Sequence, residues 1–239
     1  MRTWIAIACT VSLGASIVDA RSSESTEMLD RFLNSGKPAL TSYKARRVLT
    51  ASSMGGRMSA TLEAWTLLNP DGTFSFEVIR QEGSGLIRNR VLLAALETEQ
   101  HSRNQRNLAQ SELTPANYEF QVDQDTGEDG MATVRLFPRR QTPMLLNGTV
   151  AVKQHDGDIV LIAGSPSKSP SWWTTQVVVV RRYARIAGIR VPLEMVSRAD
   201  VRIAGESTFS MVYEYESING RAVTQGQAAA LPIARDVPP

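Results

Sequence analysis

Residues 58–80, MSATLEAWTLLNPDGTFSFEVIR, decide the fold class of this chain. Apolar and polar residues alternate over 58–64 and again over 74–78, which is the period of two that a half-buried β-strand shows. Between them stands NPDG at 69–72, where proline presets φ and glycine accepts a positive φ. The stretch therefore predicts a β-hairpin.

The same strand pattern continues on both sides of this hairpin, with short connections. The predicted strands are 43–50, 58–68, 73–80, 118–122, 131–137, 145–153, 158–163, 172–186, 189–201 and 207–217. Apolar residues at helical spacing predict two helices, at 24–35 and within 87–106. Short connections and strand alternation favour antiparallel pairing over βαβ units. The chain is therefore predicted to be mainly β (α+β), with about ten strands.

Two predicted strands are apolar on both faces. The runs 159–162 (IVLI) and 177–180 (VVVV) contain no polar residue that could face water. Such strands need cover on each side. We expect a helix on one face, and curvature, a second helix or a ligand on the other.

The N-terminus has the layout of an export signal. Arg2 precedes an apolar stretch at 4–18, and small residues lead to a cleavage position between Ala20 and Arg21. The alternative is a retained membrane anchor, but the stretch is shorter than the ~20 apolar residues of a span. We predict a signal peptide at 1–20, one domain at 21–226 and a loose tail at 227–239. The mature protein is then periplasmic or secreted, with no stable membrane span.

Composition and charge exclude several classes of protein. The 239 residues are 42% hydrophobic and 21% charged, with a net charge of +2, which is an ordinary soluble profile. That charge is too small to predict nucleic-acid binding. Arginine pairs at 46–47, 139–140 and 181–182 are expected to be solvated surface, with an anion-binding patch as the alternative.

No residue pattern predicts catalysis, a cofactor or a metal. The single cysteine, Cys9, lies in the predicted signal, so the mature chain has no thiol nucleophile. The sequence HDGD at 155–158 has metal-ligating side chains but stands where a hairpin turn is needed, and the acidic run 123–130 lacks the EF-hand register. The carboxylate pairs Glu97 with Glu99 and Glu214 with Glu216 have no predicted cleft beside them. The prediction is a non-enzyme.

Large apolar side chains recur on the predicted strands and could line a binding pocket. Simple core packing is the alternative for each of them. The candidate ligand-binding residues are Trp65, Phe74, Phe76, Tyr118, Phe120, Met211 and Tyr213.

The order of a helix, hairpin strands, an internal helix and a long antiparallel run resembles the LolA/LolB-like superfamily. The resemblance covers 24–220 and is carried by the export signal, by 43–82 with its NPDG turn, and by the strand that ends Tyr213-Glu214-Tyr215. This family includes lipoprotein-sorting proteins and the N-terminal half of RseB-type sensors. The resemblance implies an antiparallel open half-barrel whose concave face is covered by the N-terminal helix and the internal helix.

The resemblance also implies a function. A periplasmic binding protein would hold a lipid or a lipoprotein acyl chain, or another apolar small molecule, in the concavity of the sheet. The alternative is a non-catalytic module for envelope protein–protein interaction or stress sensing, with an envelope protein as its partner.

Overall fold

The computed structural model describes residues 15–35, 37–104, 107–123, 130–170, 172, 174–202 and 205–224. Side chains are described from residue 25 onward within these ranges, apart from those of residues 104, 107 and 108.

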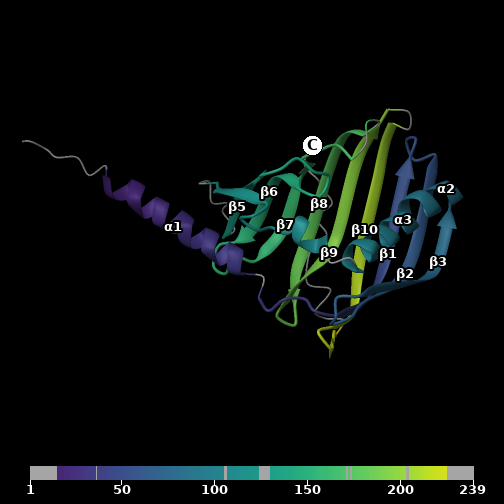
Figure 1. The fold of residues 1–239 in the computed structure, drawn as a ribbon, viewed down its shortest axis with the longest axis horizontal. Coiled ribbons are helices and arrows are strands. Elements are labelled where there is room, and N and C mark those ends of the chain that lie inside the picture. Colours follow the sequence, from purple (N-terminus) through teal and green to yellow (C-terminus); the bar gives the residue numbers. More distant parts are fainter. Residues whose placement is uncertain are drawn as a thin grey trace, which may run out of the picture.

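In the described part of the chain, eleven strands form one antiparallel sheet (Figure 1). They are β1 (Tyr43–Ser53), β2 (Met58–Leu68), β3 (Phe74–Gly83), β4 (Tyr118–Val122), β5 (Met131–Pro138), β6 (Leu146–Lys153), β7 (Ile159–Pro166), β8 (Thr174–Ile186), β9 (Ile189–Val201), β10 (Gly205–Ile218) and β11 (Arg221–Ala222). The order is β3-β2-β1-β10-β9-β8-β7-β6-β5-β4, with β11 on β10. Because β3 and β4 are edges, the sheet stays open, and the predicted fold class is confirmed.

The hairpin that decided the fold class forms as predicted. The Asn69 amide donates to the Thr73 carbonyl at 2.9 Å, and Gly72 takes a φ of 88°. The long hairpin of β8 and β9 turns through Ala187 and Gly188, with φ values of 50° and 80°. Glycine is favoured at such positions because it has no Cβ to clash.

The helices are α1 (Ala15–Asn34), α2 (Gly85–Ile87), the π-helical η1 (Arg88–Leu93), α3 (Ala94–Asn104) and the 3₁₀ turn η2 (Asn107–Gln110). The predicted helix at 24–35 is the second half of α1, which begins earlier and runs through the predicted cleavage position. The predicted helix within 87–106 is present but is interrupted by the π-helical turn, a local widening that single-sequence periodicity does not reveal.

Both helical segments cover the same face of the sheet. The last turns of α1 pack with β4–β8, where Met195 of β9 joins the cluster, and α3 packs with β1, β2 and Met211 of β10. Met195 and Met211 are direct cross-strand partners, so their side chains share one face. We call this the covered face, and Figure 1 shows α3 across one half of it and the end of α1 at the other. The predicted placement of both helices is confirmed.

The opposite, uncovered face carries cross-strand ion pairs and some apolar side chains. Lys44 pairs with Glu216 at 2.8 Å, and Arg46 pairs with Glu63 and Glu214 at 2.9 and 2.8 Å. Val178, in the run that was expected to need cover on both sides, remains 44% exposed. The expectation of cover on both sides is therefore wrong for Val178, whereas Val180, two residues further on, is only 8% exposed.

Candidate binding pocket

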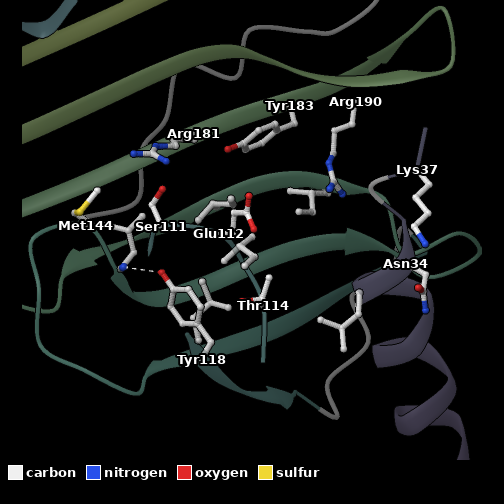
Figure 2. Close-up of a pocket in the computed structure, with 16 residues that line it drawn as sticks. Asn34, Lys37, Ser111, Glu112, Thr114, Tyr118, Met144, Arg181, Tyr183 and Arg190 are labelled. Atoms are coloured by element: carbon white, nitrogen blue, oxygen red, sulfur yellow. Dashed lines mark hydrogen bonds between the residues drawn. The ribbon is translucent and has the colours of Figure 1, made fainter. Parts of the chain in front are cut away.

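A half-open pocket of about 510 Å³ lies on the covered face, between the end of α1, residues 111–114 and strands β4–β9. Its lining is formed by Leu33, Asn34, Lys37, Ser111, Glu112, Leu113, Thr114, Tyr118, Leu136, Met144, Leu146, Ile159, Ile162, Arg181, Tyr183 and Arg190 (Figure 2). This volume falls in the range of small-molecule sites.

The roof of the pocket depends on how α1 sits on the sheet. Met28 and Phe32 are buried, and Phe32 meets Phe120 edge to face with ring centroids 5.5 Å apart. Gly157, in the turn between β6 and β7, lies against the helix backbone, since a Cβ there would be 2.4 Å from the Phe32 nitrogen. The turn can therefore support the helix only because residue 157 is glycine.

A charge cluster around the buried Asp158 fixes the end of α1. The Asp158 carboxylate accepts two hydrogen bonds from Arg185, at 2.8 and 3.0 Å. Arg185 also donates to the Ser35 carbonyl at 2.8 Å, and Arg190 donates to the Ser35 hydroxyl at 2.9 Å. Burial lowers the pKa of Arg190, and Asp158 acts against that shift. The cluster closes one end of the pocket and leaves Arg190 on its lining.

The floor is apolar. Leu136, Leu146, Ile159 and Ile162 from β5, β6 and β7 are buried there. The Tyr118 hydroxyl accepts a hydrogen bond from the Leu146 amide at 3.0 Å. Burial raises the pKa of Tyr118, and it outweighs that hydrogen bond and the nearby arginine charges. Tyr118 therefore keeps its proton at neutral pH.

Two polar side chains from β8 face this floor. Arg181 stands beside Ile162 on β7 and Met195 on β9 in the strand register, and a bulge between Arg182 and Tyr183 follows. Figure 2 shows Arg181 and Tyr183 on one side of the pocket and Tyr118 on the other. Arg181 makes no ion pair with any described residue. The pocket thus combines an apolar floor with a cationic wall.

The other half of the covered face holds a buried cation. Arg47 of β1 is 1% exposed and reaches Glu99 of α3 through two contacts, at 2.5 and 3.2 Å. Its guanidinium lies 4.4 Å from the Tyr213 ring centroid and also contacts the Tyr43 hydroxyl. Arg103 donates to Glu99 at 2.7 Å. This network fastens α3 to the sheet.

Both members of the Arg47–Glu99 pair are charged. Burial opposes the charge of Arg47, but interactions with Tyr213 and Glu99 outweigh it and raise the pKa of Arg47. Burial likewise acts to raise the pKa of Glu99, but Arg47 outweighs it and the pKa is lowered. Burial raises the pKa values of Tyr43, Tyr213 and Tyr215. An ion pair among neutral tyrosines therefore fills this half.

The structure divides the sequence-predicted site residues into three groups. Tyr118 lines the pocket, and Phe120 packs beside it with ring centroids 5.9 Å apart. A second group packs around Arg47 and α3, namely Phe74, Phe76, Met211 and Tyr213. Trp65 lies on the uncovered face under the Lys44 ammonium, 4.8 Å from its ring centroid. Ligand binding by these residues stays a prediction.

Sequence reasoning did not name Tyr183 or Arg190 of the pocket lining, and it named Arg181 only within an arginine pair that had an anion-binding patch as the alternative. A signal was present for Arg181, since it has the strand parity of Val177 and Val179, which pack on the covered face. The same parity argument places Arg47 with Ala45 and Leu49. The expectation that the arginine pairs are solvated surface is wrong for Arg47, because Glu99 and three aromatic rings compensate its burial.

The other arginines of these pairs are largely committed to contacts within the protein. Arg139 donates to the Pro115 and Tyr118 carbonyls, and Arg140 donates to the Gln110 carbonyl. Arg182 lies 3.7 Å from Glu194. These contacts weaken the case for an anion-binding patch made from all three pairs.

The carboxylates considered for catalysis do not flank the pocket. Glu214 and Glu216 pair with Arg46 and Lys44, and Glu99 is held by Arg47 and Arg103. Among the described residues, no group of three His, Cys, Asp or Glu side chains is placed to hold a metal ion. Most of the acidic run at 123–130 lies outside the described residues.

Most of the predicted signal and tail lies outside the described residues, which begin at 15 and end at 224. Cleavage between Ala20 and Arg21 stays a prediction. No helix in the described ranges combines the length and apolar character that crossing a membrane requires.

Among known proteins, this chain is similar to solved structures only. No protein-family model matches the chain, and no curated protein matches it. The LolA superfamily protein NE2245 from Nitrosomonas europaea is 8% identical with a TM-score of 0.43, over 84% of this chain and 96% of that one. MucB is 11% identical with a TM-score of 0.24, over 86% and 95%. MucB in the Pseudomonas aeruginosa MucA/MucB complex is 11% identical with a TM-score of 0.22, over 86% of this chain and 95% of that one.

These solved structures include members of the group that the sequence resembles. At such identities and TM-scores, the likeness carries no argument about the ligand or the partner of this chain. The functional case therefore rests on the pocket itself.

Proposed function

We propose that this protein is an exported, non-catalytic binding protein that holds an apolar ligand, such as a lipid or a lipoprotein acyl chain, on the covered face of its sheet. The observation that carries the proposal is the half-open pocket of about 510 Å³ over a floor of leucine and isoleucine. Burying apolar ligand surface there contributes about 25 cal/mol per Å².

The position of the pocket supports the same function. It lies under α1 and residues 111–114, which come from separate parts of the chain and meet only over β4–β9. Leu33 and Leu113 are only partly buried in this cover, so apolar surface remains for a ligand to cover. The pocket is concave, with an apolar floor and a few polar side chains, which is the usual character of a small-molecule site.

The test is titration with a fluorescent fatty-acid probe, together with native mass spectrometry of protein purified from its exported form. Saturable binding and co-purifying lipid are expected. Leu113→Asp places a charge on the lining and should weaken binding at least tenfold. Leu86→Asp is the matched control, because Leu86 is 57% exposed on α2 and outside the pocket. Binding by no lipidic probe, or equal loss in both variants, would contradict the proposal.

Export is tested on the same material. A product of cleavage after Ala20 begins at Arg21, and intact mass spectrometry of periplasmic protein measures that mass directly. A full-length mass in the membrane fraction would favour a retained anchor instead.

A second candidate function is strand addition by an envelope protein at the β3 edge. Val78 and Ile79 are exposed on this edge, 36% and 48% respectively. Against it, the β2–β3 register shifts between Glu63 and Ala64, leaving Ile79 without a cross-strand partner, and such bulges discourage edge pairing. Ile79→Lys should abolish cross-linking to a partner and leave probe binding unchanged if this function is correct.

A further inference from the structure

We propose that the pocket selects an amphiphile with an anionic headgroup, which Arg181 binds while the apolar tail lies on the β5–β7 floor. This inference rests on the proposed function and names the ligand class more closely. It starts from one observation: Arg181 lines a pocket with an apolar floor and has no ion-pair partner among the described residues.

Arg181 is exposed, and its neighbours in the sheet leave it open to a ligand. Its register partners on the two adjoining strands are Ile162 and Met195, so neither strand offers it an acceptor. Arg182, the next residue, points the other way and lies 3.7 Å from Glu194. A guanidinium presents a planar set of donors that fits a carboxylate or a phosphate.

Two hydroxyl groups add donors at the same place. The Tyr118 oxygen accepts from the Leu146 amide, so its own O–H is available, and it finds no acceptor among the described residues. Tyr183 follows Arg181 by two residues on β8, and its hydroxyl likewise bonds to none of the described residues. Figure 2 shows the Tyr183 hydroxyl on the side of Arg181. Three donors without acceptors point to an anion.

The remaining charges on the lining fit this assignment. Lys37 and Arg190 lie at the α1 end, away from Met144 and Ser111 (Figure 2). Arg190 is already held by Ser35 and lies 3.8 Å from Asp158, which makes it a poorer headgroup site than Arg181. Glu112 is the one carboxylate on the lining, and it is exposed on the segment over the pocket. The lining thus carries three cations and one anion.

The experiment compares two probes with the same tail, 11-(dansylamino)undecanoic acid and its methyl ester, titrated by fluorescence. The wild-type protein should bind the acid more tightly than the ester. Arg181→Gln should weaken the affinity for the acid about tenfold or more, as expected for the loss of a hydrogen-bonded charge. The affinity for the ester should stay unchanged. Arg182→Gln, on the uncovered face, should change neither affinity. Thermal unfolding of each variant checks that the fold is kept.

Competition identifies the source of the anion. Lysophosphatidic acid should displace the acid probe, whereas inorganic phosphate at millimolar concentration should not. Displacement by phosphate alone would indicate a free-anion site and overturn the amphiphile proposal.

The outcomes separate this inference from the function beneath it. Equal affinity for acid and ester, or an equal loss of both in Arg181→Gln, overturns headgroup recognition and leaves apolar binding intact. No binding of either probe to the wild-type protein overturns both.

Discussion

The two halves of the covered face are closed in different ways. Over β1–β3, α3 is fastened by the contact of Arg47 with Glu99, and Leu92 and Leu96 are completely buried. Over β4–β8, the end of α1 leaves a pocket of about 510 Å³. One continuous sheet therefore supports both a filled core and a hollow, and the helical cover determines which of the two forms.

Among the substitutions that test this contrast, Arg47→Ala is expected to lower the unfolding free energy most. Breaking a buried ion pair costs about 3–5 kcal/mol. Because Arg103 still pairs with Glu99, the unfolding free energy should fall by an amount at the lower end of that range. Arg46→Ala is the matched control, because Arg46 lies on the uncovered face and its ion pairs are exposed to solvent. Urea unfolding measures the unfolding free energy of both variants. Similar losses of unfolding free energy in the two would show that Arg47 does not fasten α3.

A pair of identical substitutions compares the two halves directly. Leu92→Ala creates a cavity in the filled half and should cost about 2–5 kcal/mol. Leu33→Ala removes a side chain that already borders open space, so it should cost less and should enlarge the pocket. Urea unfolding and probe titration measure the two effects. A larger loss of stability for Leu33→Ala would mean that the pocket is filled in solution.

The smallest expected effect is a pH dependence of the unfolding free energy that comes from Glu99, in the filled half. The pKa of Glu99 lies below its ordinary value of 4.5, because Arg47 outweighs the opposite effect of burial. A carboxyl whose pKa is lowered by folding stabilises the fold above its unfolded pKa, and this contribution is lost as pH falls through the folded value. The stability difference between wild type and Glu99→Gln should therefore shrink from pH 7 to pH 3. A constant difference in urea unfolding would contradict this.

Local features of the fold were predictable from the sequence because they depend on near neighbours. The NPDG turn at 69–72 and the Ala187–Gly188 turn both form where glycine permits a positive φ. Strand bounds follow the alternation closely, and β2 and β9 match the predicted ranges 58–68 and 189–201. Antiparallel pairing followed from the short connections.

Non-local features were not predictable in the same way. The partner of Arg47 is Glu99, 52 residues away, and the alternation around 45–49 places Arg47 on the covered face without naming what balances its charge. The bulge beside Tyr183 lies on β9, where Leu193 is skipped in the register, and no local pattern announces it. Trp65 illustrates the opposite error, since its large ring suggested a pocket while its parity with Glu63 places it on the uncovered face.

The pairing of β1 with β10 has a kinetic consequence. Tyr43 lies opposite Ile218, so the middle of the sheet joins the first strand to the last long strand of the described chain. Contacts of such large sequence separation require a long loop to close before they contribute any energy, and they slow folding. Until β10 is available, β1–β3 and β4–β9 are two separate sheets with unpaired inner edges. β10 is therefore the strand that completes the described sheet, and a chain that lacks it exposes two unpaired strand edges.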